Sequence, residues 1–146
     1  MTTGRAYNRI DLLYTGKGYD EARANATVYP GTLLLTDSSG EVGPNSVDGN
    51  VYDVQIALSQ QKQGALITDT IASGSLVPYV TPLLGDVFNM LLESAEAVTL
   101  DDFLTVTASG SLRVATSTDR RLFKPLEVLV GTGSGDRFCK CKYVAG

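Results

Sequence analysis

Turn signals recur about every ten residues after Asn25, and this spacing constrains the fold more than any other feature of the sequence. The runs between the turns are short and rich in β-branched and aromatic residues, as in TVYPGTLLLT, VYDVQIALS, SLVPYV and LRVATST. Helices of ordinary length do not fit between turns this close, whereas short strands do. The sequence therefore predicts an all-β domain, either a small β-sandwich or a β-barrel.

Individual turns support this prediction. Pro30-Gly31 suits the centre of a type II turn, in which glycine takes a positive φ. The stretch TVT-ASGS-LRV at 105–114 predicts a hairpin, and VYDVQIALS at 51–59 alternates as a half-buried strand does. The segment LLGDVFNMLLESAEAV at 83–98 is open to both a helix and a strand, and Gly85 together with the β-branched run after it favours the strand.

The last seventeen residues, VGTGSGDRFCKCKYVAG, are predicted to form a closing hairpin. GTGSGD is rich in glycine, but it lacks the Lys-Ser/Thr of a phosphate-binding P-loop and is followed by a strand pattern instead of a helix. In that strand Cys139, Cys141 and Tyr143 share one face, and Lys140 and Lys142 share the other. The cysteines are therefore expected inside the domain, with the lysines outside.

The residue types that are missing narrow the possible chemistry. The chain has no histidine, no tryptophan and two cysteines, so histidine-dependent catalysis and zinc sites with imidazole ligands are excluded. Carboxylates are frequent, but Glu93, Glu96 and the pair Asp101–Asp102 lie in turn-like contexts, where a structural role is expected. TDRR at 118–121 is expected in a solvated or subunit-contacting loop. The sequence predicts no enzyme, with no catalytic, cofactor-binding or metal-binding residue.

Charge is distributed unevenly along the chain. The formal net charge is −4, yet residues 28–112 carry ten acidic residues against one basic, and residues 113–146 carry seven basic against three acidic. This pattern suits contacts between protein copies better than nucleic-acid binding, which needs a basic face. Ordinary solvated surface is an equally good explanation of it. No apolar run is long enough to cross a membrane and no export signal is visible, so a soluble protein that is not exported is expected.

The N-terminal segment, residues 1–27, differs from the rest. It holds Tyr7, Tyr14 and Tyr19 among mixed charges, with no sustained period beyond a short strand-like RIDLLY. Tyrosine is common in contacts between proteins. We expect residues 1–27 to be an extended arm that orders against another protein and residues 28–146 to be the β-domain. The alternative is a terminal strand folded onto its own domain.

Three phrases in this order, YPGTLLLTDSSGEV, GDVFNMLLESAEAVTLDDFLTVTASGSLRV and LEVLVGTGSGDRFCKCKYV, resemble the head decoration (cement) proteins of tailed bacteriophages. The resemblance spans roughly Tyr29 to Val144 and rests on glycine, turn and strand phrasing. The chain departs from the family pattern at SLRVATSTDRRLFKPLEVL, where alanine and glycine are more usual. The resemblance implies a β-tulip-like domain with no catalytic site.

The resemblance also implies a role. Proteins of this family bind the outer surface of the mature head, commonly as homotrimers, and stabilise the shell against the pressure of packaged DNA. The implied partner is the major capsid protein, and the implied location is the capsid surface of the virion after synthesis in the host cytoplasm. Deleting residues 1–25 is then expected to leave a folded domain that no longer binds heads. Candidate coat contacts in the arm are Arg9, Ile10, Tyr14 and Tyr19.

Two other classes stay open. One is another structural protein of the virion, such as a tail-tube or head-fibre component, which needs no active site either. The other is a carboxylate-based binding module or enzyme. The absence of tryptophan counts against a glycan-binding module, because such modules usually present flat aromatic rings.

Overall fold

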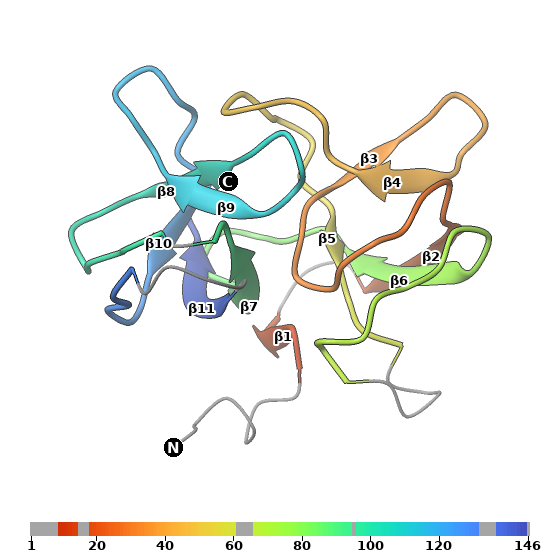
Figure 1. The fold of residues 1–146 in the computed structure, drawn as a ribbon, viewed down its shortest axis with the longest axis horizontal. Coiled ribbons are helices and arrows are strands. Elements are labelled where there is room, and N and C mark those ends of the chain that lie inside the picture. The colour runs from red at the N-terminus through yellow and green to blue at the C-terminus, as the bar shows by residue number, and fades with distance from the viewer. Residues whose placement is uncertain (1–8, 15–17, 61–65, 95, 132–136, 146) are drawn as a thin grey trace.

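The computed structural model describes residues 9–14, 18–60, 66–94, 96–131 and 137–145, and within these ranges it contains strands and no helix. Two lobes lie side by side in Figure 1. One lobe is a barrel formed mostly by the C-terminal half of the chain, and the other is built from smaller sheets of the N-terminal half. The prediction of a small all-β barrel or sandwich is confirmed.

The barrel closes because its first and last strands pair with each other. Leu92 and Leu112 form that closing contact, which is parallel, while the other neighbouring strands are antiparallel. Closure leaves the barrel without a free edge for another chain to join. In pairing order the barrel strands are β7 (Val87–Leu92), β11 (Arg137–Tyr143), β10 (Phe123–Pro125), β8 (Leu104–Val106) and β9 (Leu112–Val114).

The second lobe holds a three-stranded sheet and a hairpin. The sheet has the order β2 (Tyr19–Arg23), β6 (Leu76–Val80) and β5 (Ile56–Ala57), and the hairpin pairs β3 (Leu34–Thr36) with β4 (Val42–Pro44). Successive residues of a strand face opposite sides, so Ile56 enters the large core shared with the barrel and Ala57 a smaller second core. Each face of this sheet is therefore packed at least in part.

Aromatic rings fill the middle of the barrel. Phe88 and Phe123 are fully buried and meet edge to face with ring centroids 6.5 Å apart, and Phe123 and Tyr143 lie 5.5 Å apart. Cys139 and Cys141 are buried and free of disulfides, as the alternation of the last strand predicts. Lys140 on the opposite face is exposed. A barrel of this size is filled by its own side chains and holds no channel.

Several local predictions are confirmed and one is wrong. Residues 87–92 form a strand, so the helical alternative for this segment is excluded. The pair β8–β9 is the predicted hairpin, and Gly31 takes a φ of 82°. The strand predicted at 51–59 is wrong, because only Ile56–Ala57 is β-structure. Val51 and Val54 are buried all the same, but they reach the core from a loop and not from a strand.

The described part of the N-terminal segment is folded onto the domain. Residues 11–13 form β1 (Asp11–Leu13), which pairs with β7, and β2 pairs with β6 over five residues. Ile10 and Ala24 are 1% and 2% exposed because each fills one of the two cores. The alternative of a terminal strand thus describes these residues better than an extended arm does. The division at residue 27 stays a prediction, and residues 1–8 lie outside the described residues.

Gly110 is predicted to be essential for the β8–β9 turn. Its φ is +93°, and a Cβ placed there would lie 2.9 Å from the carbonyl oxygen of Leu33. Gly74 has a φ of +90° but open space around that position, so it is a matched control. Gly74→Ala should lower the free energy of unfolding by about 1 kcal/mol, and Gly110→Ala by roughly 2 kcal/mol or more, since a clash adds to the conformational cost. Urea unfolding of both variants measures this, and equal losses would show that the Leu33 contact is unimportant.

Candidate docking groove

A groove with a volume of about 720 Å³ lies between the first described residues and the three-stranded sheet. Residues 9–11, the start of β2, the segment after β5 and the start of β6 line it. Both charged and apolar residues are among them. The residues that line it are Arg9, Ile10, Asp11, Tyr19, Asp20, Glu21, Leu58, Ser59, Gln60, Leu76 and Pro78.

One wall is a network centred on the carboxylate of Asp11. Arg9 Nη2 donates to Asp11 Oδ2 at 3.0 Å, and the hydroxyl of Tyr19 donates to the same oxygen. The side chain of Asp11 is 6% exposed and that of Arg9 56%. The hydrogen bond to Asp11 raises the pKa of Arg9 and the pKa of Tyr19. Asp11 is therefore neutralised and fixed, and it holds the two side chains at the groove in place.

Tyr14 supports this wall from behind. Its ring centroid lies 5.5 Å from that of Tyr19 and 6.0 Å from that of Phe88, so it links the groove to the barrel core. Its hydroxyl lies 2.9 Å from the carbonyl oxygen of Gly18 and 3.1 Å from that of Thr81, within donating distance of both. Tyr14 does not line the groove. It positions Tyr19, which is 59% exposed.

The structure brings the four predicted contact residues together, but the side chain of Ile10 is buried. Ile10 is 1% exposed and belongs to the large core, although it is also among the residues that line the groove. It lies in a bend directly before β1, and its role as a coat contact stays a prediction. Arg9 and Tyr19 line the groove with exposed side chains, and Tyr14 braces them.

Another part of the groove, formed by β2 and β6, is acidic and apolar and makes up a second wall. Asp20 accepts hydrogen bonds from the backbone N–H of Glu21 at 2.8 Å and from the hydroxyl of Tyr79 at 3.3 Å. The carboxylate of Glu21 is exposed and forms no ion pair or hydrogen bond within the described part of the chain. Leu76, opposite Arg23 in the β2–β6 pair, is 47% exposed. This wall offers negative charge beside an apolar surface.

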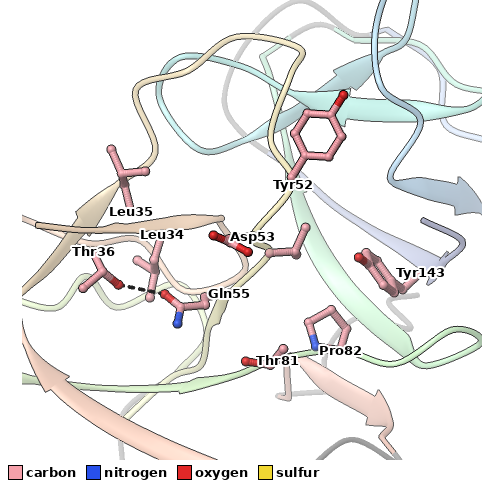
Figure 2. Close-up of a pocket in the computed structure, with 10 residues that line it drawn as sticks. Leu34, Leu35, Thr36, Tyr52, Asp53, Gln55, Thr81, Pro82 and Tyr143 are labelled. Carbon is pink, nitrogen blue, oxygen red and sulfur yellow. Dashed lines mark hydrogen bonds between the residues drawn. The ribbon is translucent and has the colours of Figure 1, made fainter. Parts of the chain in front are cut away.

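A second hollow of about 470 Å³ lies between the two lobes (Figure 2). Residues 34–36 of β3, the loop 52–55 and the pair Thr81–Pro82 surround it, together with Tyr143 from the barrel. Thr36 donates a hydrogen bond to Gln55 at 2.9 Å across one side. Asp53 is the one carboxylate among its lining residues, so no acid–base pair forms there. This second hollow is a recess with room for only a few side chains.

Two of the four carboxylates for which the sequence predicts a structural role, Glu96 and Asp102, hold backbone groups in place. Asp102 accepts the N–H of Thr99 at 2.8 Å, and Glu96 accepts the N–H of Val114 at 2.6 Å. Both bonds satisfy backbone donors in turns or at strand ends, which is the role expected for these residues. Among the described residues, no three His, Cys, Asp or Glu side chains are grouped closely enough to hold a metal ion. In the same part of the chain, no helix is long and apolar enough to span a membrane.

The loop that contains TDRR, residues 118–121, contacts other segments of the same protein. Asp119 binds Arg113 at 2.7 Å, and Asp48 holds the same guanidinium at 3.1 Å. Arg120 lies over the ring of Tyr52 at 4.4 Å, and Arg121 over that of Phe103 at 4.6 Å. These contacts fix the loop against neighbouring segments. Of the glycine-rich GTGSGD, residues 132–136 lie outside the described residues, so the hairpin connection predicted there stays a prediction.

The two thiols are predicted to be unreactive in the native protein. Burial raises the pKa of Cys139 to about 12 and the pKa of Cys141 well above its usual value. Only the thiolate reacts with alkylating agents, so at pH 8 neither thiol should be modified by iodoacetamide within hours. Mass spectrometry should then show two modified thiols after unfolding in guanidinium. Rapid modification of the native protein would contradict the burial of this strand face.

Most of the groove was not predicted from the sequence. Asp20 and Glu21 fall within residues 1–27, where basic residues offset their charge, and Ser59 and Gln60 follow a strand that is shorter than predicted. Leu76 and Pro78 look like ordinary strand residues. Only the pairing of β2 with β6 places these residues beside Arg9. The tyrosine and the two acidic residues that follow one another in GYDEA, residues 18–22, are the feature of the sequence that could have indicated a binding surface here.

Comparison with known proteins adds a fold relationship. No protein-family model matches the chain, and no curated protein matches it. Among solved structures, the chain is similar to the N base of the head fibre gp8.5 of bacteriophage phi29. The TM-score is 0.59 and the identity 12%, over 88% of this chain and 95% of that one. The chain therefore shares the fold of a phage head-fibre base along most of its length.

Proposed function

We propose that the chain is a structural protein of a tailed-bacteriophage head, one that binds the outer surface of the shell as a decoration protein and stabilises it. The observation that carries this proposal is the fold shared with a head-fibre base over 88% of the chain. The resemblance of the strand and turn phrasing to cement proteins points to the same part of the virion. On this proposal the protein acts by binding and not by catalysis.

The surface of the molecule supports a binding role. Among the described residues, fourteen large hydrophobic side chains are exposed, including Tyr52 at 67%, Leu84 at 68% and Val130 at 70%. A protein that repeats over a lattice gains affinity from many modest contacts, so it needs no deep pocket. We propose the groove around Arg9 and Tyr19 as the contact with the major capsid protein. The uneven charge of the chain is compatible with self-association into trimers.

The base of a head fibre is the second candidate. It is favoured by the similar solved structure, which is that of a fibre base and not of a cement protein. The two candidates share the attachment to the head and differ in what they do there. A decoration protein stabilises the shell, whereas a fibre base carries a further projecting part.

The test uses heads assembled without this protein. Purified protein is added, free and bound protein are separated by sedimentation, and the heads are then heated while DNA release is followed. Saturable binding with a rise in the temperature of DNA release supports the decoration role. Saturable binding without any stabilisation supports the fibre base, and no binding overturns both. Light scattering of the free protein gives its mass, and a trimer is expected.

A further inference from the structure

We propose that the groove takes an extended segment of the coat protein in which a lysine or arginine stands beside an apolar residue. This inference rests on the proposed function and adds the chemistry of the partner. The groove is expected to bind selectively, because its charged and apolar residues occupy defined positions. The carboxylate matches the basic side chain of the segment, and the apolar residues match its apolar neighbour.

The charge of the groove favours a cation. Four ionisable groups line it that carry charge at neutral pH, namely Arg9, Asp11, Asp20 and Glu21. Arg9 and Asp11 form an ion pair at 3.0 Å, so they neutralise each other. Glu21 remains without an ion pair in the described part of the chain, whereas Asp20, its neighbour in β2, points to the other face of the strand and accepts a hydrogen bond from Tyr79. A lysine or arginine placed near Glu21 would find a carboxylate that has no other partner among the described residues.

The apolar part of the groove lies next to this charge. Glu21 is opposite Pro78 in the β2–β6 pair, and Leu76 follows on the same face of β6. Leu76 and Tyr19 are 47% and 59% exposed, so both present apolar surface at the groove. Basic side chains lay their methylene stems along apolar surfaces while the charge reaches a carboxylate. Leu76 and Pro78 therefore suit the stem, and Glu21 suits the charged end.

One buried hydroxyl next to the groove is unsatisfied in the unbound protein. Ser59 lines the groove and is 5% exposed, and its Oγ has no hydrogen-bond partner among the described residues. An unsatisfied buried polar group costs free energy in the unbound protein. The atom itself is buried, so a segment lying in the groove does not reach it without a shift of the residues around it. The neutralised Arg9 argues against an anion as the preferred occupant, because Asp11 already takes its charge.

The test compares binding of four proteins to heads assembled without this protein. They are the wild type, Glu21→Lys, Leu76→Asp and a control, Glu93→Lys, which makes the same charge change at an exposed carboxylate outside the groove. Glu21→Lys should weaken binding at least tenfold, about 1.4 kcal/mol, and Glu93→Lys less than about twofold. The affinity of the wild type for heads should also fall as the salt concentration rises, because the ion pair between Glu21 and the basic residue of the coat protein would be partly exposed to solvent.

Each result decides between the proposals. If Leu76→Asp abolishes binding while Glu21→Lys binds like the wild type, the groove is the contact but its occupant is not basic, and the inference is overturned alone. If both variants bind like the wild type, the groove is not the contact with the coat protein. The inference and the assignment of this surface then fail, while the proposed role on the head stands. If the wild type does not bind heads, the proposed function itself fails. Circular dichroism of every variant checks that the fold is retained.

Discussion

Deletion of residues 1–25 is expected to disrupt the fold, with a loss of more than about 5 kcal/mol in the free energy of unfolding. The deletion removes β1 and β2, and with them five paired positions along β6 and the contacts of β1 with β7. It also removes Ile10 and Ala24, so that both cores are opened at once. Loss of one buried isoleucine alone costs about 2–5 kcal/mol.

This expectation reverses the one drawn from the sequence, in which the truncated chain stays folded. Thermal unfolding followed by circular dichroism measures the difference, and a fall of at least roughly 15 °C in Tm is expected for a chain of this length. A shorter deletion, of residues 1–8, is the control, since it leaves every described strand pairing in place. A truncated chain 26–146 that unfolds at the wild-type temperature would show that the segment is an arm after all.

Phe88→Ala should be the most damaging single substitution, with a loss of about 3–5 kcal/mol. Phe88 is 0% exposed and pairs with Asp11 of β1 on one side and Cys141 of β11 on the other. Its ring lies between those of Phe123 and Tyr14, at 6.5 and 6.0 Å. Removing the ring leaves a cavity that the closed barrel cannot collapse to fill, because its strands are tied to neighbours on both sides.

Urea unfolding measures this loss, with Leu84→Ala as the control. Leu84 precedes the same strand and is 68% exposed, so its truncation should change the free energy of unfolding by less than about 0.5 kcal/mol. If Phe88→Ala costs less than about 1 kcal/mol, the aromatic packing described for the barrel is not the source of its stability. Phe88→Ala should also weaken head binding, since Tyr14 and through it Tyr19 rest on this ring.

The groove shows how function can depend on residues that no linear motif connects. Arg9 and Tyr19 were predicted as contacts from their segment, and they do lie together at the surface. Their setting was not predictable, because Ser59 and Leu76 come from a loop and a strand that only tertiary pairing brings near. The burial of Ile10 in the large core was not predictable either, because it depends on packing against residues far away in the chain.

The sequence by itself determined the all-β class, the hairpin at β8–β9, and the inward face of the last strand with Cys139 and Cys141. These features depend on local rules, namely turn chemistry and a side-chain period of two residues. Only the tertiary structure decided that β9 closes the barrel onto β7 and that β1 and β2 belong to the domain. Such pairings join residues far apart in the chain, and their energy comes from shared burial, which no local pattern records.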